Sequence, residues 1–186
     1  MKKICGLFIA AIISIAAICG CSSAPHNDGG RTGVSEDDKY ISALNTALVS
    51  FSDCSDKLAA SLEPIADTAK IPSEAQLDNI SAAVADLSQV CAQIQNIEAP
   101  RKYAQAVTQL NDAMQKYTSA LQKCTELLNF YREFDSKIRA YKDPVKGSRE
   151  LAPKVEELYN QFASQLQQAT AAFQAACDSI NRIQSA

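Results

Sequence analysis

The chain has 186 residues, with 18 basic and 21 acidic side chains and a formal net charge of −3. Hydrophobic residues make up 47% of it, and this length is typical of a single domain with one sizeable core. The charges are uneven, because residues 28–98 hold 12 acidic and 4 basic groups (net −8) and residues 101–186 hold 9 acidic and 12 basic groups (net +3). A net-acidic chain is not typical of nucleic-acid-binding proteins, so no nucleic-acid partner is predicted.

The first twenty residues have the layout of an export signal. Lys2 and Lys3 precede an uncharged run from Ile4 to Cys21, and a basic start followed by an apolar core is the pattern of a secretory signal. The charged start stays in the cytoplasm, so the rest of the chain is expected outside it. The alternative is an uncleaved transmembrane helix, since about 18 apolar residues are the lower range of a span. The abrupt Gly-Cys-Ser-Ser end of the run, with no basic or aromatic anchor directly after it, favours the removable signal.

The run ends in Ile18-Cys19-Gly20-Cys21. This resembles the lipobox of bacterial lipoproteins, in which an aliphatic residue, a tolerant position and a small residue precede a cysteine. The resemblance implies that Cys21 receives a diacylglyceryl group, that a peptidase cuts between Gly20 and Cys21, and that the new amino group is acylated, as with palmitate. Two or more acyl chains, at about 0.8 kcal/mol per buried CH₂, give stable anchoring. We therefore expect a signal peptide over residues 1–20 and a protein anchored to the cell membrane, facing outside the cytoplasm.

A flexible tether is predicted over residues 21–35. It contains Pro25, three glycines and almost no apolar side chains, so it cannot bury enough surface to offset its ordering entropy. After Cys21 its fourteen residues span roughly 20 Å on average and at most about 48 Å. The domain proper is expected over residues 36–186.

Four amphipathic helices are predicted in that domain. Apolar residues recur every three or four positions, which places one apolar stripe on each helix, and no long stretch alternates as a strand would. The stripes run from Ile41 to Leu62, from Leu77 to Ile94, from Val107 to Tyr141 and from Val155 to Ile183. We expect an all-α fold, an antiparallel four-helix bundle. The third and fourth helices, at about 35–40 residues, would extend as a hairpin past the first two, at about 25–28.

Helix ends are indicated by capping residues and prolines. Ser35 is placed to cap the first helix, and Ser73 with Gln76 forms a capping-box pattern for the second. Residues 143–148, which include Asp-Pro and Gly-Ser, indicate the loop between the last two helices. Pro153 indicates that the fourth helix begins close to it, because proline is tolerated in a first turn but not in a helix interior.

The four cysteines after Cys21 fall one on each apolar stripe. An even count outside the cytoplasm suggests disulfides, and height along the bundle favours Cys91–Cys177 together with Cys54–Cys124. Both pairs would join diagonal helices. The alternative is four buried thiols that pack as small hydrophobes. No Cys-x-x-Cys pair is present to start a zinc site, so no metal is predicted.

Residues for catalysis are scarce. The one histidine, His26, lies in the tether, which removes a Ser-His-Asp apparatus, a Glu-x-x-His di-iron site and His-ligated haem from the domain. Gly147 is the single glycine after Gly33, so no phosphate-cradling loop is expected. We predict neither enzyme activity nor a cofactor.

The predicted hairpin carries the strongest local charge signal. Seven basic residues stand against four acidic ones over residues 132–154, a net of +3. The functional interpretation is a distal contact for an envelope protein or an anionic wall polymer. The simpler interpretation is a mixed-charge hairpin whose charges are solvated and whose aromatic side chains pack inward. The candidate contact residues are Arg132, Lys137, Arg139, Lys142, Lys146 and Arg149.

Two functions follow from these features. The preferred one is a non-catalytic binding or scaffold module held at the membrane through Cys21. The alternative is a lipoprotein that binds a small apolar ligand between its helices, in room left beside small side chains of the fourth helix. Those small side chains also permit close helix packing, and a cavity lined by the fourth helix would favour the ligand. They are Ala171, Ala172, Ala175 and Ala176.

Overall fold

A computed structural model describes residues 35–66 and 71–185. The predicted signal peptide, Cys21 and all of the tether before Ser35 lie outside these residues. The described part contains six helices and no strand, so the all-α prediction is confirmed. The helices are α2 (Glu36–Ser61), α3 (Glu63–Ala66), α4 (Glu74–Gln95), the 3₁₀ helix η2 (Arg101–Tyr103), α5 (Ala104–Arg139) and α6 (Pro144–Gln184).

The two predicted helix N-caps are confirmed. The Ser35 hydroxyl oxygen accepts a hydrogen bond from the Asp38 backbone N–H at 3.1 Å. The Ser73 backbone N–H donates to Gln76 Oε1 at 2.8 Å, and the Gln76 backbone N–H donates to Ser73 Oγ at 3.4 Å. Each bond satisfies a backbone N–H that has no partner inside the helix, which is why these sequences begin α2 and α4.

The predicted start of the fourth helix is wrong. We expected a loop over residues 143–148 and a helix beginning near Pro153, but α6 begins at Pro144 and continues through Pro153. A proline inside a helix costs about 3 kcal/mol because it removes one hydrogen bond and crowds the preceding turn. Packing on both sides of Pro153 offsets this cost, since Leu151 lies partly buried against the core and Val155 is buried in it.

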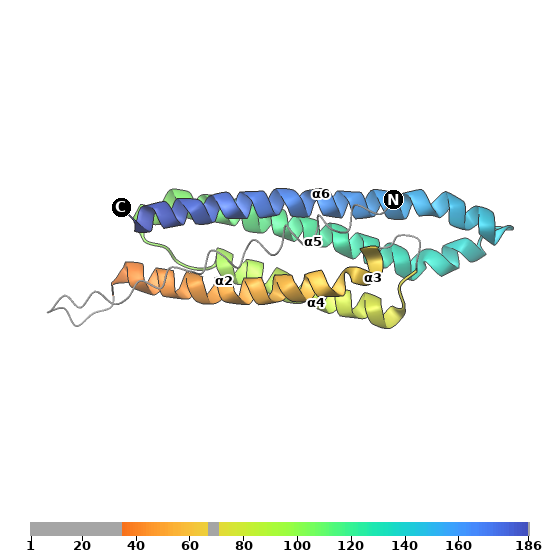
Figure 1. Cartoon of the computed structure of the whole chain (residues 1–186), viewed down its shortest axis with the longest axis horizontal. Coiled ribbons are helices and arrows are strands. Elements are labelled where there is room, and N and C mark those ends of the chain that lie inside the picture. The colour runs from red at the N-terminus through yellow and green to blue at the C-terminus, as the bar shows by residue number, and fades with distance from the viewer. Residues whose placement is uncertain (1–34, 67–70, 186) are drawn as a thin grey trace.

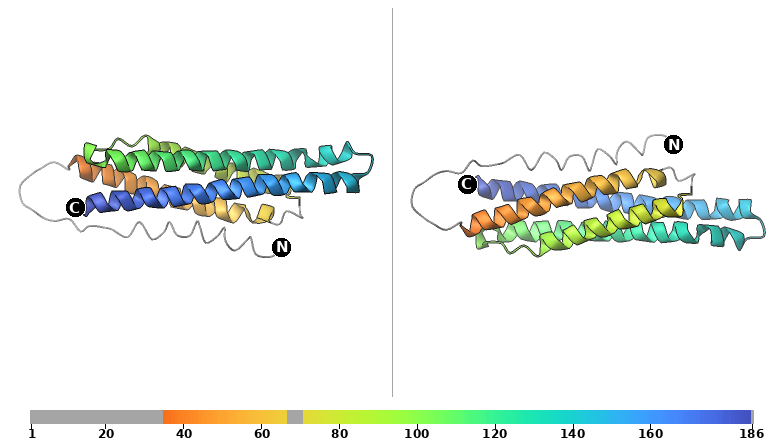
Figure 2. Two further views of the ribbon diagram at one scale, coloured as in Figure 1. Left: turned by 90° about the horizontal axis from the view of Figure 1, so that it is seen from above. Right: turned by 90° about the horizontal axis from the view of Figure 1, so that it is seen from below.

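The long helices lie side by side in an elongated molecule (Figure 1). α2 packs against α4, α4 against α5, and α5 against α6, and successive long helices run in opposite directions (Figure 2). The start of α2 and the end of α6 lie at one end, which we call the anchored end because the predicted tether joins there. At the other end α5 and α6 continue past α3 to their connecting turn (Figure 1).

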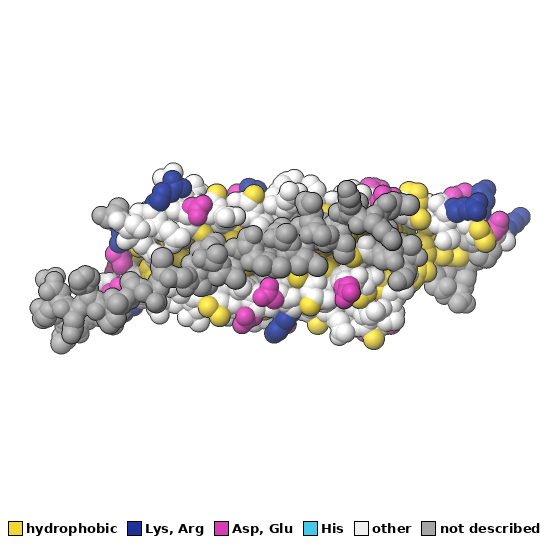
Figure 3. Space-filling model, viewed as in Figure 1, with side chains coloured by type: hydrophobic (Ala, Val, Ile, Leu, Met, Phe, Trp, Pro, Cys, Tyr) yellow, Lys and Arg dark blue, Asp and Glu magenta, His cyan; other side chains and the backbone are white. Residues whose placement is uncertain are grey.

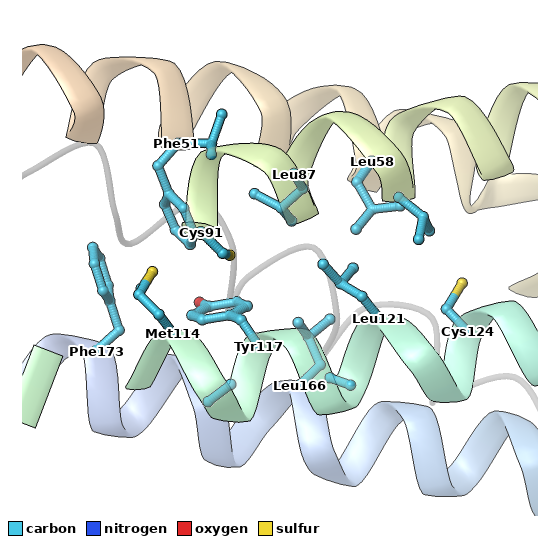
Figure 4. Packing of buried hydrophobic residues seen from close by; sticks show 14 of the residues in the cluster. Phe51, Leu58, Leu87, Cys91, Met114, Tyr117, Leu121, Cys124, Leu166 and Phe173 are labelled. Carbon is cyan, nitrogen blue, oxygen red and sulfur yellow. The ribbon is translucent and has the colours of Figure 1, made fainter. Parts of the chain in front are cut away.

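The core is a continuous cluster of apolar side chains from all four long helices. At its centre Phe51 of α2 stacks on Phe173 of α6, with ring centroids 4.9 Å apart, and meets Tyr117 of α5 edge-on at 5.0 Å (Figure 4). The Tyr117 hydroxyl and the Thr170 hydroxyl are 2.9 Å apart and share a hydrogen bond. Fully burying side chains of this size contributes about 1.5–3 kcal/mol each, so this aromatic group joins three helices firmly.

Candidate functional site

The turn between α5 and α6 is short and tightly capped. The Tyr141 backbone N–H donates to the Ile138 carbonyl at 3.0 Å as α5 ends. Two residues later the Asp143 carboxylate accepts hydrogen bonds from the backbone N–H groups of Val145 (2.9 Å) and Lys146 (3.3 Å). These bonds begin α6 directly and hold the turn in one conformation.

Close packing of Tyr141 on Gly147 shapes the same turn. A Cβ atom added at Gly147 would lie 2.7 Å from Tyr141 Cδ2 and 2.8 Å from Cγ, closer than real Cβ contacts allow. The ring therefore lies against the α6 backbone and is half-buried. Gly147 is required here for space rather than for a turn, which the sequence pattern did not reveal.

Positive charge gathers at this turn, as the blue side chains in Figure 3 show. Lys142 and Arg149 are exposed and form no ion pair with any described side chain. Lys146 is 70% exposed and only approaches Glu150, with Nζ 3.7 Å from Oε1. Together with Val145, which is 61% exposed, these residues form a surface that we call the basic tip: Lys142, Val145, Lys146 and Arg149.

Arg132, another of the predicted contact residues, is paired with side chains of α4. Its guanidinium Nε lies 3.1 Å from a carboxylate oxygen of Glu74, and its Nη2 lies 2.8 Å from Asp78 and 3.1 Å from the Ser81 hydroxyl. All three partners belong to α4. These acceptors also raise the pKa of Arg132, with the hydrogen bond to Glu74 as the largest cause. Arg132 therefore ties α5 to α4.

Lys137 also has interaction partners, both on its own helix. Its ammonium lies 2.8 Å from Glu133, one turn earlier on α5, and 4.5 Å from the centre of the Phe130 ring. Cation–π and ion-pair contacts of this kind hold the side chain along its own helix. The Arg139 side chain lies outside the described residues. Of the six predicted contact residues, the structure thus brings Lys142, Lys146 and Arg149 together.

The predicted disulfide pairs are not formed, because no disulfide joins the four cysteines of the described helices. The pairing assumed that all helices end level at the anchored end, but α4 ends well short of the start of α2 (Figure 1). This shift brings Cys91 near Cys54 of the adjacent helix, close enough for an electrostatic interaction between the thiols. Burial raises the pKa of Cys91 to about 12 and likewise that of Cys124.

A second candidate site is a groove of about 750 Å³ between α2 and α6 at the anchored end. Its buried lining is apolar, whereas its exposed lining carries amides, hydroxyls and a few charges. At one end Lys102 forms an ion pair with Asp37. We call this site the α2–α6 groove. Its floor is Leu44, Leu48, Tyr103, Cys177 and Ile180, and its rim includes Asp38, Ser42, Asn45, Thr46, Asn181 and Gln184.

The alanines suggested for a ligand cavity do not line this groove. Ala171 and Ala175 are exposed and Ala172 is half-buried, so three of the four are not in the interior. Ala176 is fully buried and lies in the packed core. The groove lies beyond it, from Cys177 onward, and sequence analysis missed it because its shape depends on how far α2 stands from α6.

Within residues 35–66 and 71–185, no group of three or more potential ligands is placed to hold a metal ion. In the same residues no helix combines the length and apolar character needed to cross a membrane. Several polar atoms are buried without a hydrogen-bond partner, among them the Tyr40 hydroxyl and the Ser55 hydroxyl.

Comparison with known proteins finds no relative. No family model, no curated protein and no solved structure matches this chain.

Proposed function

We propose that this protein is a membrane-anchored lipoprotein whose helical domain is a non-catalytic binding module outside the cytoplasm, with the basic tip as its contact surface. The anchor is the Cys21 lipid that the lipobox resemblance implies. We further propose that the four long helices form an antiparallel four-helix bundle, with the α5–α6 hairpin extending from it. The observation that carries the proposal is the group of three exposed basic side chains of the basic tip, at the end of the molecule opposite the start of α2 (Figure 1).

The geometry suits a contact held away from the membrane. α6 runs from the basic tip to the anchored end and contains 41 residues, which at 1.5 Å per residue is about 60 Å. The predicted tether adds reach and lets the domain reorient. When the domain points away from the membrane, the tip extends beyond the lipid headgroups, where other envelope components lie.

The chemistry of the basic tip defines the class of partner. Three basic side chains without strong ion pairs attract an anionic surface, and the attraction acts over about 8 Å at physiological salt. Val145 adds an exposed apolar contact at the centre. By contrast α2 and α4 carry eight acidic and two basic residues. We therefore expect an acidic envelope protein or an anionic wall polymer to bind at the basic tip. The acidic side chains of α2 and α4 should repel the same partner.

The first test is in-cell crosslinking from a photoreactive amino acid at Lys146, with a matched probe at Asp86 of α4. Adducts are identified by mass spectrometry of the lipidated protein. A discrete protein or polymer adduct at Lys146 and not at Asp86 is expected. Equal adducts at both positions, or adducts at neither, would argue against a tip-specific partner.

Charge reversal gives a second, independent test. The triple variant is Lys142→Glu, Lys146→Glu, Arg149→Glu, and the photoreactive amino acid is placed at Val145 because Lys146 is itself replaced. This variant should lose the adduct that forms at the basic tip. Its helical content and melting temperature should stay near those of the parent. The control is Lys39→Glu with Lys57→Glu, which reverses two exposed charges on α2. An unchanged yield of the tip adduct in the triple variant would contradict the proposal.

A further inference from the structure

We propose that the basic tip recognises an acidic protein segment that carries an apolar side chain between its carboxylates, such as one face of an acidic amphipathic helix. This choice rests on the proposed function and narrows it, because it selects a protein partner over an anionic wall polymer. Three features carry it: the exposed Val145, the small net charge of the turn and the fixed backbone that presents the basic side chains.

Val145 gives the basic tip an apolar contact among its charges. Its side chain is 61% exposed, and both Val145 and Lys146 lie one turn before Arg149, so the three side chains are neighbours on the surface of α6. A single exposed valine is ordinary on a protein surface, but this one is adjacent to two basic side chains. A partner side chain that covers Val145 removes apolar surface from water. A wall polymer of sugars or phosphodiesters has no comparable side chain to place there.

The net charge of the turn is small for a surface that binds a polyanion. Residues 142–150 hold three basic groups against the carboxylates of Asp143 and Glu150, which gives a net charge of +1. Affinity for a polyanion grows with the number of charges that are neutralised, as it does for nucleic acids. A repeating polyanion would also approach both carboxylates. A protein segment with two or three carboxylates can place each of them against a basic group and avoid the two acids.

The basic side chains are suited to carboxylates. The guanidinium of Arg149 is exposed, and a planar guanidinium binds a carboxylate through two parallel hydrogen bonds. Lys146 Nζ lies 3.7 Å from Glu150 Oε1, and the two side chains are 70% and 48% exposed. An ion pair of this kind contributes little free energy, so Lys146 can exchange Glu150 for a carboxylate of the partner. Lys142 adds a third positive charge from the turn before α6.

The backbone of the basic tip is fixed before a partner binds. The Asp143 carboxylate accepts hydrogen bonds from the backbone N–H groups of Val145 and Lys146 at 2.9 and 3.3 Å. Gly147 packs directly against the Tyr141 ring. Association therefore orders only the exposed side chains, which lowers the entropy cost of binding. A fixed arrangement of charges around an apolar side chain suits recognition of a defined protein surface.

The test measures peptide binding to the lipidated full-length protein in phosphatidylcholine nanodiscs by fluorescence anisotropy. One synthetic helical peptide carries glutamates on one face with leucines between them, and the matched peptide has a serine in place of each leucine and the same charge. Poly(glycerol phosphate) is the polymer probe. The triple variant Lys142→Glu, Lys146→Glu, Arg149→Glu gives the background, including any peptide bound to the lipid.

The leucine peptide should bind the parent roughly fivefold more tightly than the serine peptide, which corresponds to burial of a valine side chain that is 61% exposed. Val145→Asn should reduce this preference to within about twofold. The control Val49→Asn, at a valine of α2 that is 51% exposed, should retain it. A preference below about twofold in the parent, or one that persists in Val145→Asn, would overturn the choice of partner.

Failure of the proposed function would look different. If neither peptide nor poly(glycerol phosphate) binds the parent more tightly than the triple variant, the basic tip is not a contact surface and both proposals fall. If poly(glycerol phosphate) binds the parent more tightly than the leucine peptide at equal charge concentration, the contact surface stands and the protein partner is wrong. In cells, the adduct from a photoreactive amino acid at Lys146 should contain a partner peptide, and a polymer adduct would likewise overturn only the choice of partner.

Discussion

Phe51 is predicted to be the side chain on which the association of α2 with α5 and α6 most depends. It is fully buried, and it contacts Phe173 of α6 and Tyr117 of α5 at ring-centroid distances of 4.9 and 5.0 Å. Replacing a buried phenylalanine with alanine costs about 3–5 kcal/mol, part of it from the ring pairs at about 0.5–1.5 kcal/mol each. Since small domains are stable by about 5–15 kcal/mol, Phe51→Ala should remove a large part of the total.

The loss is measured by urea denaturation followed by circular dichroism, with thermal melting as a second assay. At about 2–4 °C per kcal/mol for a domain of this size, the melting temperature should fall by roughly 6–20 °C. The control is Val49→Ala, two residues earlier in α2 and 51% exposed, which should change stability by no more than about 0.5 kcal/mol. A loss below about 1 kcal/mol for Phe51→Ala would refute the enclosed aromatic group at the centre of the core.

Three further predictions concern stability and thiol chemistry. Arg132→Ala should reduce the free energy of unfolding by about 1 kcal/mol, because exposed ion pairs contribute little, and should leave capture at the basic tip unchanged in the crosslinking assay. At pH 8 a maleimide should modify Cys54, which is partly exposed, well before Cys91 and Cys124, as peptide mapping would show. Alkaline pH should destabilise the protein, as denaturation at a series of pH values would show. Burial disfavours the charged form of four groups and raises each pKa to about 12, so between about pH 9 and 12 the unfolded state binds fewer protons and stability falls as pH rises. A flat profile over this range would contradict the burial of these groups, which are Tyr40, Cys91, Tyr117 and Cys124.

The helices could be predicted because their signals are local. Spacing of apolar residues by three and four identifies a helix within one segment, and a capping box such as Ser73 with Gln76 needs only four residues. The boundaries of α2 and α4 follow from these patterns within a residue or two. Pro153 misled the analysis because the local cost of a helical proline is offset by packing of the distant α5 along α6.

Relative positions of the helices could not be predicted in the same way. The prediction of disulfides was wrong because the position of Cys91 along the long axis depends on where α4 ends relative to the start of α2. The segment from Asn96 to Tyr103 spans the remaining distance before α5 begins. No residue type in this segment indicates how far it extends. An error of a few residues at 1.5 Å each is enough to change which thiols are neighbours.

The two candidate sites differ in how far the sequence reveals them. A cluster of basic residues predicts the basic tip, but which members are available depends on long-range partners. Arg132 is held by Glu74, which lies 58 positions earlier in the chain. Tyr40 was missed as a core residue, although it lies four positions before Leu44 on the same helical stripe. The groove itself arises from the separation of two helices that are far apart in sequence.

α6 joins the two sites, and its packing argues that they act separately. The basic tip surrounds its first turns and the groove lies beside its last, while between them Phe162 and Phe173 are fully buried in the core. Packed interiors do not deform continuously, so a ligand in the groove would reach the tip only by shifting α6 against α5, which meets it along most of its length. Such a shift would break the ring contacts around Phe51. Binding in the groove and binding at the basic tip are therefore expected to be independent, with α6 as a spacer between them.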